Sequence, residues 1–452
     1  MCSVALYNQF PLTYPDAGDY IGNARSLAAG RAPGFFYRPF TYSVFLVPFA
    51  TRYTIWFVPL AQGVVVAWVV DLALRSAGVF LSARMFVAVF AALSFFSTLP
   101  WFSGQIMPDL FTSLVILLFF VVIYGNEARG RGEPWTTGGI LAFAIAAHLS
   151  HIPLYGALLL GAFVVRMAVG GETLPWRRFI HATIPLVVAV LVVMTPNFLR
   201  YREPVLSRSS HLFYLAHLVN DGLAQRFLDR ACVTERYFLC ADRGTLRADT
   251  DWFLWATEGP GQRYDSQWRS GDPTFRHEVH AIIAGTVRQE LPAVVGLSLR
   301  AAVIQLVTFG AHRGEHWFSR SVHAAMERIR LRPWYLASRQ VQGTLPLEAI
   351  TIVHYVGVAV GLLLLVGCLA RLRGPADRSL RLFIATACSG IALNALVVGS
   401  LALVANRYQR RVVWLIPLLG LVAAAQVCAR RRASSRRQAP DSVDTRDGDE
   451  RV

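Results

Sequence analysis

The chain has 452 residues, of which 54% are hydrophobic and only 16% are charged. This composition lies outside the range of soluble globular domains and is typical of proteins that cross a membrane several times. The formal net charge of +16 is compatible with nucleic-acid binding. However, the arginines stand between apolar runs and in the C-terminal tail, as in membrane proteins with positive cytoplasmic loops. We therefore expect no nucleic-acid partner.

Residues 1–53 contain no apolar stretch of about 20 residues, so they predict a first extracytoplasmic loop with surface helices. Apolar runs of about spanning length follow at residues 54–75, 82–100, 108–125, 136–150, 152–169 and 178–199. They predict a bundle of six spans over residues 54–199. The connections alternate between those that carry arginine and those that do not, which places the arginine-bearing ones in the cytoplasm and Asp16 outside.

Residues 200–347 are polar and irregular and predict an extracytoplasmic loop domain. Within them, residues 291–309 are apolar, and we interpret them as an interfacial or buried helix because a crossing there would put the arginine-rich tail outside. Cys232 and Cys240 flank a polar loop and are candidates for a disulfide in an oxidising compartment. Their spacing fits no zinc site.

Three further apolar runs, at about 348–370, 380–404 and 411–429, predict a second bundle over residues 348–429. The tail, 430–452, is rich in Arg, Ser and Asp, and we expect it to be disordered and cytoplasmic. The fold class predicted is an all-α polytopic membrane protein with about nine transmembrane helices. The alternation of charge also places Asp109 and His148 at the outer face.

Asp16 and Asp19 are candidate acids at the start of a helix-forming run. Being three residues apart, they share one face of a helical turn, and a carboxylate at a membrane surface can take a proton from a hydroxyl nucleophile. The alternative is structural, because aspartate is common at helix N-termini. Asp109 follows Pro108 at a predicted helix start and has the same two interpretations.

His148 and His151 lie at a predicted outer membrane edge, where ionisable groups usually face protein or water. They could bind phosphate or a sugar hydroxyl, and a metal or haem pair is the weaker reading because no other ligands cluster with them. Arg407 and Arg410 precede the last span on the predicted outer side. Arginines there suit phosphate oxygens, or they are interfacial residues whose charged ends reach water.

The N-terminal stretch resembles the first extracytoplasmic loop of the polytopic glycosyltransferases that use polyprenyl-phosphate sugars. These are the GT-C enzymes of the protein mannosyltransferase and aminoarabinose transferase superfamily. The matching residues are Asp16, Tyr20, Ala24-Arg25-Ser26-Leu27 and Tyr37-Arg38-Pro39-Phe40. Ala17 stands where the family often has Glu. The resemblance also implies a span upstream of Asp16, which would make ten.

The resemblance implies that Asp16 is the catalytic base, with Asp19 and Asp109 as further acids of the site. It implies that Arg407, Tyr408 and Arg410 meet the phosphate of the donor. Tyr20 and Arg38 are then expected to contact substrate, with His148 and His151 nearby.

The function expected is transfer of a sugar from a polyprenyl-phosphate donor to a lipid, glycan or protein acceptor. We expect this hexosyl- or pentosyltransferase to act in cell-envelope assembly, at the outer face of a bacterial inner membrane. No nucleotide-binding loop occurs, and no metal site is expected, although a divalent ion is compatible with the chemistry. The alternatives are a transporter or flippase for lipid-linked glycans, and a non-catalytic envelope scaffold.

Overall fold

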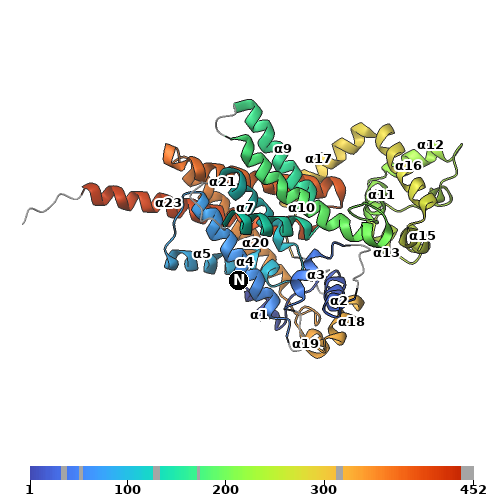
Figure 1. Ribbon diagram of the computed structural model, residues 1–452, viewed down its shortest axis with the longest axis horizontal. Helices are drawn as coiled ribbons and strands as arrows, with labels where there is room; N and C mark the ends of the chain where they lie inside the picture. Colours follow the sequence, from blue (N-terminus) through green and yellow to red (C-terminus); the bar gives the residue numbers. More distant parts are fainter. Residues whose placement is uncertain (32–37, 50–53, 126–132, 170–173, 312–318, 439–452) are drawn as a thin grey trace, which may run out of the picture.

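The computed structural model describes residues 1–452 except 32–37, 50–53, 126–132, 170–173, 312–318 and 439–452. The described residues are helical, and their only β pairing is an isolated bridge between Leu12 and Gln105. Figure 1 shows a bundle of long helices, with helix α23 (Leu415–Gln438) leading away at one end. A group of short helices lies at the opposite end.

Six helical segments in the described chain are long and apolar enough to cross a membrane. They are α4 (Phe57–Ser76), α9 (His151–Val169), α10 (Trp176–Tyr201), α20 (Leu347–Leu369), η4 (Pro375–Asp377) with α21 (Arg378–Leu401), and α22 (Asn406–Val413) with α23. A seventh is counted if α16 (Pro273–Gln289) and α17 (Leu291–Val307), bent by 91°, form one span. The chain is therefore a multi-pass helical membrane protein.

Three of the nine predicted runs form apolar helices of only 14 or 15 residues. They are α5 (Ala83–Phe96), α7 (Leu110–Tyr124) and α8 (Glu133–Ala146). At about 1.5 Å per residue, such helices reach roughly 22 Å, which is less than the hydrocarbon core of about 30 Å. All nine predicted runs are thus helical, while the count of nine spans stays a prediction.

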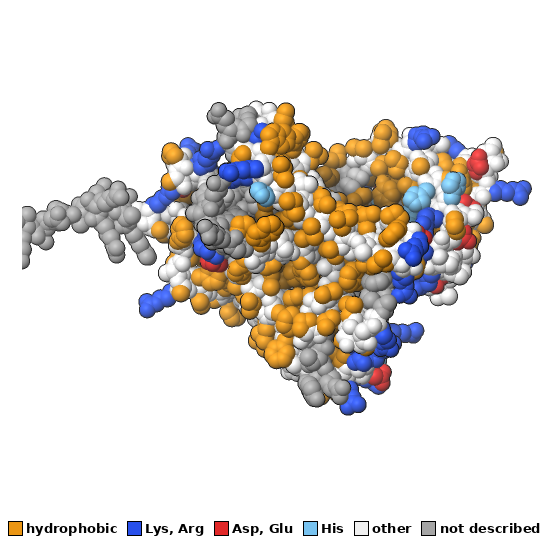
Figure 2. Space-filling model, viewed as in Figure 1, with side chains coloured by type: hydrophobic (Ala, Val, Ile, Leu, Met, Phe, Trp, Pro, Cys, Tyr) orange, Lys and Arg blue, Asp and Glu red, His pale blue; other side chains and the backbone are white. Residues whose placement is uncertain are grey.

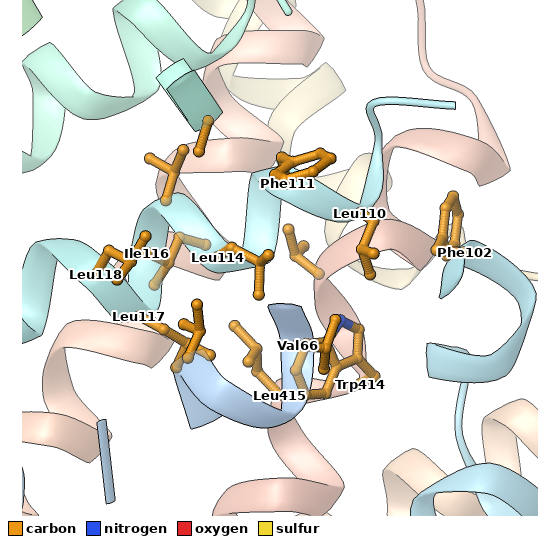
Figure 3. Packing of buried hydrophobic residues seen from close by; sticks show 14 of the residues in the cluster. Val66, Phe102, Leu110, Phe111, Leu114, Ile116, Leu117, Leu118, Trp414 and Leu415 are labelled. Carbon is orange, nitrogen blue, oxygen red and sulfur yellow. The ribbon is translucent and has the colours of Figure 1, made fainter. Parts of the chain in front are cut away.

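Helix α7 lies at the centre of the bundle because its sequence is apolar on every side, which only a surrounded helix can bury. Figure 3 shows its leucines facing Val66 of α4, Trp414 and Leu415. Trp414 also donates its indole N–H to Ser113 Oγ at 3.1 Å. The beginning of α7 is thereby fixed against the α22–α23 junction, and the same end carries Asp109.

The surface supports membrane placement of the bundle. Figure 2 shows hydrophobic side chains covering the middle of the visible face, whereas charged side chains gather toward the ends of the molecule. Many apolar side chains of α10, such as Ile180, Val187 and Leu191, and of α20, such as Leu363, are exposed. Exposed apolar surface of this extent requires a non-aqueous environment.

The apolar run predicted at 291–309 forms α17, and it is not buried in protein: Gln305 is its only buried residue. It packs along α21, where Gly399 meets the backbone of Ala302, and its outer face carries exposed valines and leucines. Burial within the protein is therefore excluded by the structure. The helix contacts α21, α22 and α16, and its exposed apolar side chains face outward.

Residues 200–347 divide between two hydrophobic cores. A separate core forms within residues 212–297. Its helices, with α16, are α11 (Ser210–Asn220), α12 (Leu223–Ala231), η2 (Phe238–Asp242), α13 (Thr250–Trp255), α14 (Pro260–Arg263) and α15 (Asp265–Ser270). Helices α18 (Arg320–Arg328) and α19 (Arg332–Ala337) instead join the core of the bundle.

Residues 319–345 pack against the N-terminal segment, which forms α1 (Ser3–Asn8), α2 (Ala17–Ala28) and α3 (Thr41–Leu46). Ser321 Oγ donates to the Pro15 carbonyl at 2.9 Å, and Gln340 Nε2 donates to the Thr13 carbonyl at 2.8 Å. Gly18 leaves no room for a side chain beside Ser321. The segment that leads to Asp16 is thus held by residues more than 300 positions away.

The C-terminal helix continues past the predicted end of the last span. Helix α23 reaches Gln438, so the tail does not become irregular at Arg430 as predicted. Alanine and arginine are strong helix formers and prolong a helix that has already begun. The remainder of the predicted disordered tail, 439–452, lies outside the described residues.

Helices α20 and α23 touch through glycine backbones, and this contact gives a stability prediction. A Cβ at Gly361 would stand 2.5 Å from Pro417 Cα, whereas one at Gly367 of the same helix would meet nothing within 4 Å. We expect Gly361→Ala to lower the free energy of unfolding by about 1–3 kcal/mol through overpacking. Thermal unfolding in detergent measures this.

Gly367→Ala is the matched control and should be neutral or stabilising, because alanine favours helix where space is open. Equal melting temperatures for the two variants would contradict the close α20–α23 contact.

Candidate functional site

Asp16 and Asp109 both occupy the N-cap position of a helix, yet neither side chain caps it. Asp16 precedes α2 and Asp109 precedes α7, and no backbone amide of either helix bonds to the carboxylate. Capping is the usual reason for aspartate at this position. Here both carboxylates contact arginines instead, so helix capping does not account for the two aspartates.

Arg407 joins the two acids. Its Nη1 lies 3.3 Å from Asp16 Oδ2 and its Nε lies 3.2 Å from Asp109 Oδ1. The other oxygen of Asp16, Oδ1, accepts from Arg38 Nη2 at 2.5 Å. Asp16 therefore lies between two guanidinium groups, one from the N-terminal segment and one from α22. The side chains of all four residues are at most 24% exposed.

Asp109 has a second arginine partner, Arg411, whose Nη1 lies 3.3 Å from the same Oδ1. Both side chains are fully buried. Burial alone would raise the pKa of Asp109, but Arg407 and Arg411 outweigh it and hold that pKa below its usual range. Asp109 is therefore ionised at neutral pH. Its other oxygen, Oδ2, has no hydrogen-bond partner within the described structure.

The spacing of the arginines explains how α22 provides two side chains to this cluster. Arg407 and Arg411 are four residues apart and lie on one face of the helix. Arg411 also donates from Nη2 to Ser150 Oγ and to Asn394 Oδ1, each at 3.0 Å. These neutral acceptors fix the guanidinium, so the buried ion pair has a defined geometry.

Arg410 lies apart from Arg411 despite being its neighbour. Its guanidinium carbon is 4.4 Å from the centre of the Trp101 ring, and its Nη1 donates to the Gly310 carbonyl at 3.3 Å. Arg411, and not Arg410, contacts Asp109 together with Arg407, while the phosphate role expected for Arg410 stays a prediction. Residues three and four positions after Arg407 both lie near its face of the helix, so only the contacts of α22 distinguish Arg410 from Arg411.

The two predicted histidines have different surroundings. His151 is fully buried, with Nδ1 at 2.6 Å from the Ala144 carbonyl and Nε2 at 2.7 Å from Thr112 Oγ1. Both ring nitrogens form hydrogen bonds within the protein, so neither is available to bind a substrate. His148 is half-buried and its Nδ1 lies 2.8 Å from Ser150 Oγ, the hydroxyl that Arg411 contacts.

Burial and the charge of Arg411 hold the pKa of His148 well below its ordinary value. Through Ser150 and Arg411, His148 is linked to Asp109. The structure thus joins His148, but not His151, to the acidic cluster.

Aromatic rings border the cluster. The guanidinium carbon of Arg407 lies 4.2 Å from the Tyr14 ring centre and 5.4 Å from that of Tyr408. Tyr20 is 1% exposed, packs edge-on against Tyr42 at 5.1 Å and has no hydrogen-bond partner for its hydroxyl within the described structure. Tyr14 is a residue that the sequence did not single out, since nothing in its spacing distinguishes it.

Asp19 lies at the open edge of the site. Its Oδ2 is 3.8 Å from Arg38 Nε, and its side chain is 51% exposed. It therefore has the weaker claim to a catalytic role than Asp16. Of the motif 37–40, Tyr37 lies outside the described residues, whereas Arg38 provides the contact described above.

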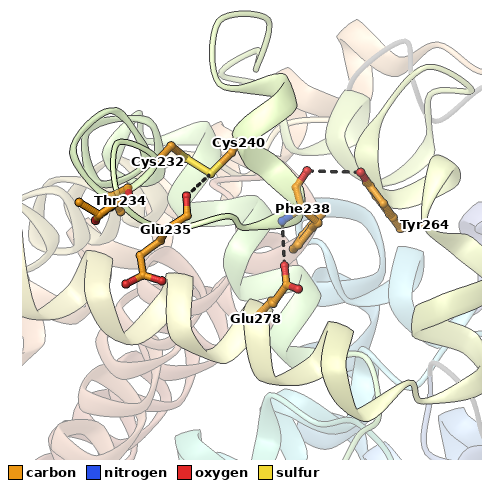
Figure 4. Close-up of a disulfide and its surroundings, with 8 residues drawn as sticks. Cys232, Thr234, Glu235, Phe238, Cys240, Tyr264 and Glu278 are labelled. Carbon is orange, nitrogen blue, oxygen red and sulfur yellow. Dashed lines mark hydrogen bonds between the residues drawn. A yellow bond between two sulfur atoms is a disulfide. The ribbon is translucent and has the colours of Figure 1, made fainter.

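Cys232 and Cys240 form a disulfide with their Cα atoms 5.6 Å apart. Figure 4 shows it beside Glu235, while Phe238 N–H donates to Glu278 of α16. The bond ties the end of α12 to η2, in the core of residues 212–297 and away from the acidic cluster.

No group of three or more His, Cys, Asp or Glu side chains among the described residues has the arrangement of a metal site. The acids of the cluster are each paired with arginine, which repels a cation. The residues present do not fit a divalent metal.

No family model, no curated protein and no solved structure matches this chain. Its function must therefore be argued from the residues of the cluster.

The Asp109–Arg411 pair predicts strong coupling in a double-mutant cycle. Either Asp109→Leu or Arg411→Leu leaves a buried charge with lost partners, which typically costs about 3–5 kcal/mol of stability. The double variant should lose clearly less than the sum of the two, because neither charge remains. Thermal unfolding of the four proteins in one detergent measures the coupling.

Arg371→Leu, at an exposed arginine, is the control and should change stability by no more than about 0.5 kcal/mol. Additive losses at Asp109 and Arg411 would show that the pair is not formed.

Proposed function

We propose that this protein is a membrane glycosyltransferase that moves a sugar from a polyprenyl-phosphate donor to a hydroxyl acceptor. The observation that supports this most is the meeting of Asp16, Asp109 and Arg407 in one cluster. A carboxylate that can take a proton stands beside arginines that can hold a phosphate, as this transfer requires.

The charge of the cluster favours an anionic substrate. Three arginines, Arg38, Arg407 and Arg411, surround the two carboxylates of Asp16 and Asp109. Asp19 adds negative charge only at the edge of the cluster, because its Oδ2 is 3.8 Å from Arg38 Nε and its side chain is half-exposed. Arginine presents several N–H groups in a fixed fork that matches phosphate oxygens. A bound phosphate would satisfy the excess positive charge.

The chemical step assigns one role to each group. The acceptor hydroxyl attacks the anomeric carbon of the donor sugar, forming a new C–O bond while its proton passes to Asp16. The bond between the anomeric carbon and the phosphate oxygen breaks, and polyprenyl phosphate leaves with the electron pair. Arg38 and Arg407 stabilise the charge on the leaving phosphate, and Asp109 with Arg411 holds Arg407 in place.

We place the cluster at the outer face of a bacterial inner membrane. The pattern of arginine-bearing connections and the disulfide at Cys232 both favour this orientation. The donor is then a lipid in the outer leaflet, and the acceptor is a lipid, glycan or protein of the cell envelope.

The position of the charges favours a transferase over a transporter. Asp16, Asp109, Arg407 and Arg411 gather where helices α2 and α7 begin, beside helix α22. A transporter instead needs polar groups along a path through the membrane.

Asp16→Asn tests the catalytic role. Asparagine keeps the size of the side chain but takes no proton, so transfer from a polyprenyl-phosphate sugar should fall by about 10²–10⁴-fold. The rate of product formation by purified protein in detergent or liposomes measures this, and gel filtration establishes that the variant is folded.

Asp71→Asn is the matched control, since Asp71 forms an i,i+4 pair with Arg75 and is 46% exposed. It should transfer sugar at the normal rate. Normal turnover by folded Asp16→Asn protein would remove Asp16 as the base.

A labelling experiment tests the orientation. In a variant whose free cysteines, Cys2, Cys368, Cys388 and Cys428, are replaced by serine, Asp19→Cys places one thiol at a half-exposed position. A membrane-impermeant maleimide should label it in intact spheroplasts. Labelling that requires permeabilised membranes would place the cluster in the cytoplasm.

A further inference from the structure

Two small hollows adjoin the acidic cluster, one beside each arginine that contacts Asp16. The first has about 260 Å³ of space, partly open to solvent, and is lined by Arg38, Pro39, Phe40, Leu149, Val193, Pro196, Asn197, Leu206 and Ser207. The second has about 220 Å³ and is lined by Thr13, Tyr14, Gln105, Gln340, Arg407 and Arg410. The lining of the first is largely apolar, whereas every residue of the second is polar or carries a hydroxyl.

Two glutamines in the second hollow, here called the polar hollow, are equally buried but differ in their bonding. Gln340 is 3% exposed; its Oε1 accepts from Thr13 N–H at 3.0 Å and its Nε2 donates to the Thr13 carbonyl at 2.8 Å. Gln340 therefore holds the N-terminal segment in place. Its amide is fully used within the protein.

Gln105 is also 3% exposed, but its side-chain Oε1 has no hydrogen-bond partner within the described structure. The backbone of Gln105 has a structural role, since its carbonyl accepts from Gln62 Nε2 at 2.9 Å and the residue forms the bridge with Leu12. A buried acceptor left unpaired costs about 1–3 kcal/mol. A side chain retained at such a cost is expected to serve binding.

We propose that the polar hollow binds the hydroxyl-rich acceptor, a carbohydrate group, and that Gln105 recognises one of its hydroxyls. This inference rests on the transferase function proposed above and adds the acceptor class and a specificity-determining residue. A hydroxyl group is favoured at this point because Gln105 Oε1 is a neutral acceptor, which pairs with an O–H donor and not with an anion. The hollow itself is small and partly open to solvent, so it suits one hydroxyl group of a sugar whose ring lies at its mouth.

The arrangement puts the two substrates on opposite sides of Asp16. Arg38 contacts Oδ1 and lines the apolar hollow, which suits a phosphate attached to a hydrocarbon chain. Arg407 contacts Oδ2 and lines the polar hollow.

Gln105→Met tests the proposal, because methionine keeps the length of the side chain and removes its amide. In transfer assays the acceptor KM should rise about tenfold, as for one lost hydrogen bond, while the donor KM stays within about twofold. The melting temperature should stay the same or rise, since an unpaired buried acceptor is removed. A merely structural glutamine would instead lose stability.

Gln340→Met is the matched control from the same hollow and should lower the melting temperature, because it breaks the bonds to Thr13. Unchanged acceptor KM in folded Gln105→Met protein overturns the proposal while leaving the transferase function intact.

A binding measurement separates the two claims when no transfer is detected. Saturation-transfer NMR with a panel of methyl glycosides should show contacts to wild-type protein that are lost in Gln105→Met. Such a result supports the carbohydrate site even if polyprenyl-phosphate sugars prove not to be donors. Absence of contacts to wild-type protein, or equal contacts to both proteins, overturns it.

Discussion

The contact of Arg407 with both Asp16 and Asp109 is the interaction on which the site depends. Each of these charges is largely removed from water, and none would be stable there alone. Meeting in one place, they join the start of α2, the start of α7 and helix α22. The N-terminal segment is therefore part of the bundle's structure as well as of its chemistry, which explains why residues 319–345 hold it so closely.

Three residues in and beside the cluster depart from ordinary structural roles. Asp16 and Asp109 occupy capping positions without capping, and Gln105 buries an acceptor without a protein partner. Each departure gives up stability that a simpler residue would keep. Proteins usually accept such losses at binding and catalytic sites. Asp109 Oδ2 and Gln105 Oε1 have no hydrogen-bond partner within the described structure, and we propose that a ligand completes these contacts.

Sequence reasoning located the helices and three central site residues, because apolar runs and charges at their ends are local features. Asp16, Asp109 and Arg407 were expected to meet at one membrane face; the three side chains contact one another in the structure, while the membrane face stays a prediction. The roles of Arg410 and Arg411 could not be told apart, since that depends on the rotation of α22 against α7. The use of both nitrogens of His151 and the division of residues 200–347 depend on tertiary packing, which a single sequence does not display.

The central claim is that the arginines around Asp16 form a phosphate site for a lipid substrate. The most direct measurement is the affinity of the purified protein for polyprenyl phosphate compared with the uncharged polyprenol. We predict clear preference for the phosphate in wild-type protein and loss of that preference in Arg38→Gln, whose side chain is 24% exposed and removable without leaving a deeply buried charge. Equal affinity for phosphate and alcohol in wild-type protein would contradict the account.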